Sequence, residues 1–387
     1  DTLKSSGAVF GEKLGWERAN WFAERDEEPH DIYTFGQPNW HGAVAREHKA
    51  ARDAAVLFDQ TSFAKYILVG PDAEQALQWI AANRVDKPVG TIIYTQMLND
   101  NGGIECDLTC VRTKYNEYYI TTGTGYATHD FDWIGRNIPS DLNVQLVDVT
   151  SSNAVLSLFG PKARDILEIV TTGDVSNTVH PFGFARQIGI AGCSVLAMRI
   201  TYVGELGWEL HLPVENAQTV YSALIEAGTP LGLRNAGYRA IDTLRLEKGY
   251  RAWSSDIGPD HTPDEAGLGW AVKMKSNISF KGRDAIARQR EEGIKKIMAT
   301  FTTDSDIILS GRETIYRNGH RCGWLSSAGF GHTIGKFIGM GYVRSDEYID
   351  TEYVLSGEYE LEVATERVKA NVFLKPLYDP KMEKIKT

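Results

Sequence analysis

Two stretches of the chain share one pattern of apolar and polar positions. In YILVGPDAEQALQWI (66–80) and LSLFGPKARDILEIV (156–170), a short apolar run is followed by a Gly-Pro pair and then by apolar residues at helical spacing. Proline suits the first turn of a helix, where its missing N–H would have no partner. The pattern predicts a repeated strand–turn–helix unit, of which WELHLPVENAQTVYSALIEAG (208–228) is a looser third copy.

Between the first two copies, apolar and polar residues alternate as they do in strands. We expect a hairpin from TIIYTQML (91–98) and IECDLTCVRT (104–113), joined by the turn NDNGG and followed by a strand at 118–123. The content of Ala, Arg and Leu predicts helices over 42–59 and 239–251. Strand–helix units that recur in this way predict an α+β fold with a duplicated body.

The pattern changes after about residue 295, where short β-rich runs are separated by turn residues. TEYVLSG (351–357) is one of these runs, and YELEVATERVKANVFL follows it. Many short strands with polar turns predict a small antiparallel barrel. The expected organisation is an aromatic opening segment at 1–37, the α+β body at 38–292 and a C-terminal β-barrel domain at 293–387.

Composition and charge narrow the possible functions. The chain has 387 residues and a net charge of −10, without the basic stripe that nucleic-acid binding requires. No apolar run approaches the ~20 residues that span a bilayer. The four cysteines form no CxxC pair and the nine histidines no ligand-spaced motif, so no metal site is predicted. We expect the cysteines to be small buried residues of a protein in a reducing compartment.

Two carboxylates stand out in the predicted strands. Asp107 shares a polar face with Glu105 and Thr109, and the pattern alone favours a solvated hairpin face for all three. Asp is nevertheless disfavoured in strands, so a functional charge is the alternative. Glu209 follows the turn YVGELG with apolar neighbours on both sides. It is either a surface residue or a buried carboxylate that needs a two-donor partner.

Five motifs then occur in one order: GGIECDLT, TYVGELGWEL, LRLEKGYRAW, PDEAGLGW and PLYDP. Together they resemble the aminomethyltransferase family, which comprises the T-protein of the glycine cleavage system and its relatives. The resemblance runs from about residue 38 to the end. The opening FGEKLGWERANWF is similar to the segment that follows the flavin domain in dimethylglycine and sarcosine dehydrogenases. Because the sequence begins with Asp1, we expect either processing or a piece of a longer chain, with residues 1–37 as a linker after a missing flavin domain.

The resemblance implies three lobes around a central tetrahydrofolate, with Asp107 as the catalytic residue near folate N10 and Glu209 on the pterin edge. The remaining residues that it places around the folate are Tyr94, Tyr119, Thr121, Tyr202, Trp270 and Tyr378. FAD is expected only on a missing domain or a separate subunit. Glu105 is expected to remain on a solvated face.

Two departures from the T-protein affect the expected carrier of the one-carbon unit. Ile241 stands where the T-protein has Arg, and Cys106 stands where the family commonly has an acidic or small residue. A lipoyl carrier protein is therefore less expected than a free or channelled one-carbon unit.

The expected function is capture of the iminium or formaldehyde derived from dimethylglycine or sarcosine as 5,10-methylenetetrahydrofolate. One alternative is direct methyl transfer to folate from a sulfonium or quaternary amine. Another is a non-catalytic role like that of the regulatory subunit of pyruvate dehydrogenase phosphatase, which resembles the same dehydrogenases. The expected partners are folate, a small N-methylated substrate and a flavoprotein domain or subunit, without nucleic acid or membrane. The expected location is the cytoplasm, or the mitochondrial matrix in a eukaryote.

Overall fold

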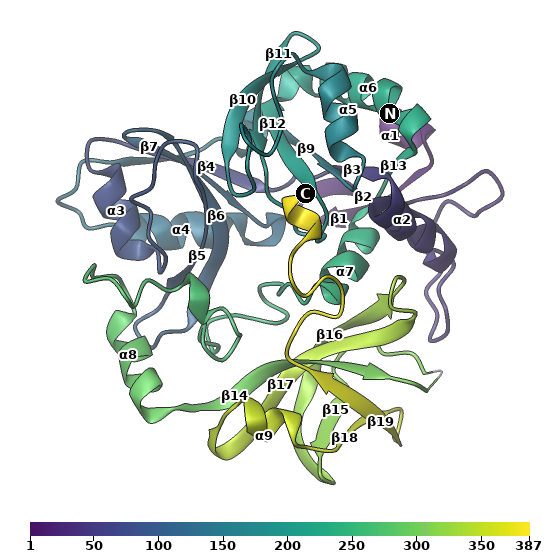
Figure 1. Ribbon diagram of the computed structural model, residues 1–387, viewed down its shortest axis with the longest axis vertical. Coiled ribbons are helices and arrows are strands. Elements are labelled where there is room, and N and C mark those ends of the chain that lie inside the picture. The colour runs from purple at the N-terminus through teal and green to yellow at the C-terminus, as the bar shows by residue number, and fades with distance from the viewer. Residues whose placement is uncertain (306) are drawn as a thin grey trace.

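The computed structural model describes residues 1–305 and 307–387, which form three lobes around a common centre (Figure 1). The first lobe is a five-stranded sheet in the order β5-β6-β7-β4-β8. Its elements are β4 (Ala64–Val69), α3 (Ala73–Ile80), β5 (Ile92–Leu98), β6 (Ile104–Lys114), β7 (Glu117–Thr122), α4 (Ala127–Asn137) and β8 (Gln145–Asp148). Helices α3 and α4 pack on one face of this sheet, where Cys106, Leu108 and Cys110 of β6 join the core.

The second lobe is a six-stranded sheet in the order β10-β11-β12-β9-β3-β13. Its strands are β3 (Ala55–Asp59), β9 (Asn153–Phe159), β10 (Ala185–Ile190), β11 (Cys193–Met198), β12 (Gly207–Pro213) and β13 (Leu233–Asn235). Its helices are α1 (Thr2–Ser5), α2 (His41–Asp53), α5 (Ala163–Val170), α6 (Ala217–Gly228) and α7 (Tyr238–Glu247). Helices α5 and α6 cover one face, whereas α2 and α7 pack on the other.

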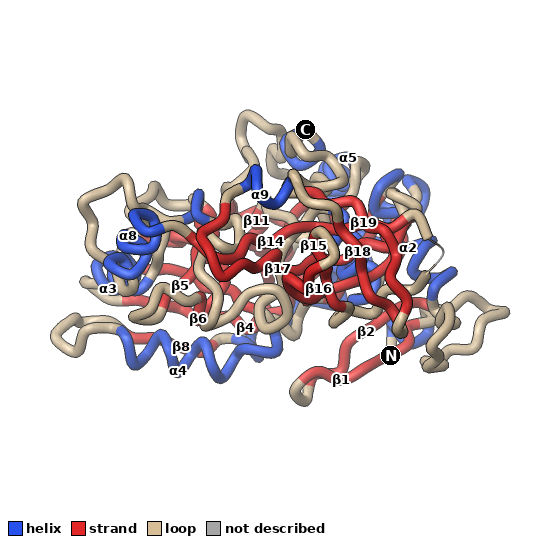
Figure 2. Tube along the Cα trace, turned by 90° about the horizontal axis from the view of Figure 1, so that it is seen from below, coloured by secondary structure: helices blue, strands red, loops and turns tan. Residues whose placement is uncertain are grey.

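A two-stranded ribbon, β1 (Ala8–Lys13) with β2 (Trp16–Phe22), packs against the second lobe. Trp21 of β2 is fully buried in the cluster that α2 and α7 also form. In Figure 2 this ribbon and α4 lie along the same side of the molecule. Trp21 therefore anchors the opening segment to the second lobe, whereas Tyr33 and Phe35 of the same segment are exposed.

The third lobe is a closed antiparallel barrel in the order β14-β17-β16-β15-β18-β19. Its elements are β14 (Ile294–Thr303), β15 (Thr314–Arg317), β16 (His320–Gly331), β17 (Lys336–Ile349), α9 (Thr351–Leu355), β18 (Tyr359–Val363) and β19 (Glu366–Phe373), preceded by α8 (Arg283–Glu292). Sheets and helices combined with this barrel confirm the predicted α+β class and C-terminal barrel. Within residues 1–305 and 307–387, every helix is too short or too polar to pass through a bilayer.

The predicted strand–turn–helix repeat is present as β4 with α3 and as β9 with α5. Gly70 and Gly160 occupy the same place in the two copies, with φ of +147° and +132°. A Cβ on Gly70 would lie 2.3 Å from the carbonyl oxygen of Asn143, and one on Gly160 would lie 2.4 Å from that of Ala54. Both turns therefore need glycine, because the backbone of a neighbouring segment passes directly over them.

Three predicted elements are wrong in part. The helix predicted at 239–251 ends at Glu247. The helix predicted at 42–59 ends at Asp53, and residues 55–59 form β3, whose apolar AVLFD run is buried in the sheet. The run predicted as β at 351–357 contains helix α9 instead. The Asp350 side chain caps this helix by accepting a hydrogen bond from the N–H of Tyr353 at 2.8 Å. Such capping favours a helical turn over a strand.

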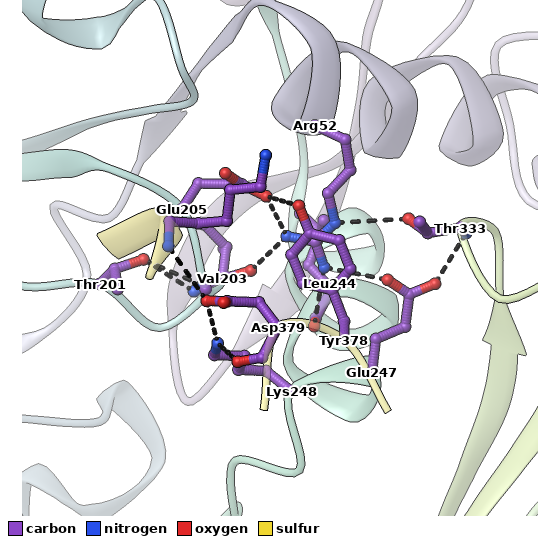
Figure 3. A network of polar contacts seen from close by, with 12 residues as sticks. Arg52, Thr201, Val203, Glu205, Leu244, Glu247, Lys248, Thr333, Tyr378 and Asp379 are labelled. Atoms are coloured by element: carbon purple, nitrogen blue, oxygen red, sulfur yellow. Dashed lines mark hydrogen bonds and ion pairs between the residues drawn. The ribbon is translucent and has the colours of Figure 1, made fainter. Parts of the chain in front are cut away.

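A buried polar network joins the lobes (Figure 3). Arg52 of α2 contacts Glu205 at 2.9 Å and Glu247 of α7 at 3.0 Å. Glu247 also accepts a hydrogen bond at 2.7 Å from the N–H of Thr333, in the turn between β16 and β17 of the barrel. The Tyr378 hydroxyl, beyond β19, donates to Glu205 at 2.6 Å. One arginine therefore connects the second lobe, the barrel and the C-terminal segment.

We predict that Arg52→Met lowers the free energy of unfolding by about 3–5 kcal/mol, because it leaves two buried carboxylates without their cation. Urea denaturation followed by circular dichroism measures this change. Lys49→Ala on the same helix is the matched control, since Lys49 pairs with Asp53 on an exposed face and such pairs contribute less than about 1 kcal/mol. Similar losses in the two variants would show that the network does not hold the lobes together.

Candidate functional site

The inner face of the first sheet, opposite α3 and α4, carries most of the predicted site residues of this lobe. Strand register pairs Gln96 of β5 with Asp107 of β6. It also pairs Tyr94 with Thr109, and Thr109 with Thr121 of β7. Because paired residues, and residues two apart, point to the same face of a sheet, Tyr94, Gln96, Asp107 and Thr121 share one face. Alternation along β7 places Tyr119 on it as well.

Two donors hold one oxygen of the Asp107 carboxylate. Its Oδ1 accepts a hydrogen bond from the Tyr94 hydroxyl at 2.6 Å and another from Nε2 of Gln96 at 2.9 Å. Within the described part of the chain, Oδ2 accepts none. Burial raises the pKa of Asp107 to about 6, although these two hydrogen bonds and the charge of Arg251 act in the opposite direction. The carboxylate is thus oriented by one oxygen and poised to exchange a proton near neutral pH.

An aromatic wall lies next to Asp107. Tyr94 stacks on Trp270, with ring centroids 5.7 Å apart and planes at 28°. Trp270 is 71% exposed, so its outer face is open to a ligand or solvent. Tyr202 stacks on Tyr250, with centroids 5.8 Å apart, and its hydroxyl donates to the carbonyl of Arg251 at 2.8 Å. These rings come from the first sheet and from the loops at 200–206 and 248–270, which the fold brings together.

Glu209 belongs to a second polar chain on β12. Its Oε2 lies 3.4 Å from Nε2 of His211, and Nδ1 of His211 lies 3.1 Å from the Tyr119 hydroxyl. Burial lowers the pKa of His211, which therefore stays neutral. The arrangement assigns the proton to Nε2, which donates to Glu209, while Nδ1 accepts from Tyr119. The side chain of Glu209 is buried, yet its Oε1 accepts no hydrogen bond from the described residues.

Two buried polar atoms near Asp107 also lack a partner among residues 1–305 and 307–387. They are Oγ1 of Thr121 and Oε1 of Gln96. Leaving such a group unpaired costs about 1–3 kcal/mol, so native proteins rarely tolerate it without a ligand or water. Together with the free oxygens of Asp107 and Glu209, these atoms form a set of unused hydrogen-bonding positions on the inner faces of the two sheets.

Tyr378 and Glu105 take part in other contacts. Tyr378 packs on the guanidinium of Arg52 at 3.8 Å and belongs to the network that joins the lobes. The sequence pattern predicted that Glu105 lies on a solvated face beside Asp107. This prediction is wrong, because the Glu105 side chain has partners in the structure. It accepts a hydrogen bond from Asn99 at 3.1 Å and lies 3.5 Å from His129 of α4. Glu105 thus helps to fix the hairpin that presents Asp107.

Cys106, His129 and Asp130 place ligand-type atoms within 4.8 Å of one another, a cluster that motif spacing did not predict. Asp130 is already satisfied, because it accepts hydrogen bonds from Thr122 at 2.6 Å and from Nδ1 of His129 at 2.9 Å. Burial raises the pKa of the Cys106 thiol well above its usual value, which disfavours the thiolate that metals bind. We interpret this cluster as the anchor of α4 on the sheet.

Three residues of this region were not predicted from the sequence. Gln96 and His211 lie two positions after Tyr94 and Glu209, so strand alternation would have found both. Arg251 gave no local signal, because its neighbours at the site come from distant segments. A separate cavity of about 450 Å³, lined by Trp79, Tyr115 and other residues outside this group, lies against α3.

Two family descriptions match the chain: "GCVT N-terminal domain" over residues 1–276, and "Glycine cleavage T-protein C-terminal barrel domain" over residues 296–379. Mitochondrial sarcosine dehydrogenase from Mus musculus is 36% identical over 426 residues, covering 100% of this chain and 46% of that protein. The chain therefore spans less than half the length of this relative.

An aminomethyltransferase from Halothermothrix orenii is 35% identical over 318 residues, covering 82% of this chain and 88% of that protein. The crystal structure of glycine cleavage system aminomethyltransferase T from Bartonella henselae superposes with a TM-score of 0.82 at 24% identity. The superposition covers 98% of this chain and 96% of that one, so the two share a fold.

We predict that Tyr94→Phe raises the pKa of Asp107 further, because the lost hydroxyl stabilises the ionised carboxylate. A hydrogen bond to a charged group contributes about 1.5–3 kcal/mol, which corresponds to roughly one to two pH units. Titration of the carboxyl carbon of Asp107 by nuclear magnetic resonance gives this value. The control is Tyr115→Phe, an exposed tyrosine, which should leave the titration of Asp107 unchanged.

Proposed function

Because the chain belongs to the glycine cleavage T-protein family, we propose that it transfers a one-carbon unit to tetrahydrofolate. Its source would be the iminium or formaldehyde derived from dimethylglycine or sarcosine, and its product 5,10-methylenetetrahydrofolate. The main support for this proposal is the hydrogen bonding and the pKa of Asp107. One of its oxygens is held by Tyr94 and Gln96, the other is free, and its pKa is about 6.

The chemistry explains why a carboxylate is needed there. Tetrahydrofolate is a substrate whose N10 is an arylamine, so its attack on an electrophilic carbon requires loss of a proton. Above pH 6 Asp107 is ionised and its free oxygen can accept that proton or stabilise the cation that develops. General base catalysis of this kind typically contributes ~10²–10⁴-fold to the rate.

The unused hydrogen-bonding positions fit a folate. Glu209 offers a carboxylate for the ring N–H and the 2-amino group of the pterin, which present two parallel donors. Tyr119, Tyr202 and the exposed face of Trp270 would supply aromatic surface around the bound molecule.

The wider assembly is also part of the proposal. We propose that residues 1–37 connect the folate-binding body at 38–292 and the barrel at 293–387 to a flavoprotein domain or subunit. FAD on that partner would oxidise the N-methylated substrate. In a eukaryote the matrix of mitochondria is the proposed location, since the mouse relative is mitochondrial.

We predict that Asp107→Asn lowers the rate of methylenetetrahydrofolate formation from formaldehyde by at least about 10²-fold. Tetrahydrofolate binding, measured by calorimetry, should persist, and the melting temperature should be equal or higher because a buried charge is removed. Asp165→Asn, on an exposed part of α5, is the matched control and should remain active. The catalytic role of Asp107 is wrong if Asp107→Asn turns over as fast as the wild type, or if neither protein forms methylenetetrahydrofolate.

The pH dependence of the same reaction gives a second prediction. The pKa of Asp107 is raised, so its basic form is lost below about pH 6 and present above it. We expect kcat/KM of the wild type to rise with pH through about 6 and then level off. Chromatography of the product also tests the direct methyl-transfer alternative, because 5-methyltetrahydrofolate would exclude capture of an iminium or formaldehyde.

A further inference from the structure

Arg251 is a guanidinium with unused hydrogen-bond donors next to the proposed catalytic carboxylate. Its Nε donates to the carbonyl of Ala266 at 2.9 Å, and its Nη1 donates to the carbonyl of Gly249. Its Nη2 makes no hydrogen bond to the described residues, and none of their carboxylates lies within 4.0 Å of the guanidinium. Nη2 lies against Gly267, where a Cβ would come within 2.9 Å of it. The loop therefore leaves this nitrogen uncovered.

Two other arginines of the interior have an acidic partner, whereas Arg199 donates, among the described residues, only to the carbonyls of His180 and Thr387. Arg52 contacts Glu205 and Glu247, and Arg245 contacts Asp256 at 2.7 Å. Burial lowers the pKa of Arg251, as expected for a cation that has lost water without gaining a paired carboxylate. An arginine remains charged in such a place, so its planar pair of N–H groups is suited to a carboxylate from a ligand.

The position of Arg251 indicates which ligand carries that carboxylate. Its charge acts on both Asp107 and Tyr94. The carbonyl of Arg251 accepts the hydroxyl of Tyr202, and the segment that contacts its guanidinium continues into Trp270, which stacks on Tyr94. Arg251 is thus built into the same group as Asp107, where the one-carbon donor must meet folate N10.

We propose that Arg251 binds the carboxylate of the one-carbon donor, so that the site takes an intact N-methylene amino acid rather than free formaldehyde. This inference rests on the function proposed above and assigns its substrate class. Arg251 orients the electrophilic carbon of the donor toward folate, while Asp107 accepts the proton. A donor without a carboxylate loses this orientation and reacts only as formaldehyde does.

The step balances without an oxidant. The iminium H₂C=NH⁺–CH₂–COO⁻ and tetrahydrofolate give 5,10-methylenetetrahydrofolate and glycine. The carbon forms single bonds to N10 and N5 of folate while both of its bonds to the glycine nitrogen break. The two protons that leave folate end on the glycine amino group, the N10 proton by way of Asp107. Arg251 stays bound to the carboxylate and neither gains nor loses a proton.

The experiment measures methylenetetrahydrofolate formation by the full chain from formaldehyde alone, with glycine, or with methylamine. Glycine and formaldehyde condense to the carboxylate-bearing iminium with loss of water, and methylamine gives the same iminium without the carboxylate. We expect saturable acceleration by glycine and none by methylamine. All rates are measured at about pH 8.5, so that Asp107 stays ionised even without the charge of Arg251, which lowers its pKa. Arg251→Gln should then reduce the ratio of the glycine-dependent rate to the formaldehyde-only rate by roughly 10- to 100-fold, the effect of losing a charged hydrogen bond.

Arg251→Lys and Arg136→Gln complete the comparison. The lysine variant keeps the charge without the planar fork, so it should raise the KM for glycine while the formaldehyde-only rate is unchanged. Arg136 lies on an exposed face of α4, and its variant should behave as the wild type. Failure of the wild type both with formaldehyde alone and with glycine added would overturn the proposed function. A normal formaldehyde rate without glycine acceleration, or full acceleration in Arg251→Gln, would overturn only the role of Arg251.

A glutamyl tail on folate is another source of carboxylate, and a second comparison separates it from the donor. Calorimetry with tetrahydrofolate and with tetrahydropteroate, which lacks the glutamate, measures both affinities in the wild type and in Arg251→Gln. Our proposal expects the substitution to leave both affinities unchanged. Weaker binding of tetrahydrofolate alone would instead assign Arg251 to the tail and overturn the proposal.

Discussion

The pairing of Arg52 with Glu205 and Glu247 is the polar interaction on which the placement of the barrel and the C-terminal segment against the second lobe depends. The two sheets and the barrel each close a hydrophobic core of their own. Smaller apolar clusters join the first sheet to the second and α7 to the barrel. Burying these charges is favourable only when all of their partners are present. His48 and Arg52 hold the pKa of Glu247 at about 2, although burial alone would raise it. The ionised network therefore acts together with the apolar contact of α7 to fix the barrel against the second lobe.

Direct contacts between the two sheets bring their inner faces together. Tyr119 from the first sheet reaches His211 from the second, which in turn reaches Glu209. The loop after α7 then lies between the sheets and the barrel, where Arg245 holds Asp256 and the Tyr342 hydroxyl donates to the carbonyl of Asp256 at 3.0 Å. Asp107, Glu209 and Arg251 thus meet at the centre because polar contacts join segments from all three lobes.

Local patterns predicted much of the fold. Alternation, turn residues and helical spacing predict the Gly-Pro repeat, the hairpin at 91–113 and the barrel. These patterns depend only on residues that are close together in the sequence. The errors arose where tertiary contacts outweigh local propensity. Residues 55–59 form a strand because the sheet buries them on both faces. Glu105 appeared to belong to a solvated face because its partners, Asn99 and His129, are recognisable only after folding.

The sequence by itself predicted the strand–turn–helix repeat, the hairpin, the barrel and the family, and it identified Asp107 and Glu209 as carboxylates that need an explanation. It did not determine their protonation or their partners. Burial and charged neighbours set the pKa of a carboxyl group, and for Asp107 these come from β5 and from a loop more than a hundred residues away. Only the tertiary structure showed that Arg251 lacks an acidic partner among the described residues. Whether a charged side chain is paired depends on all the residues that surround it in the fold, and these come from distant parts of the sequence.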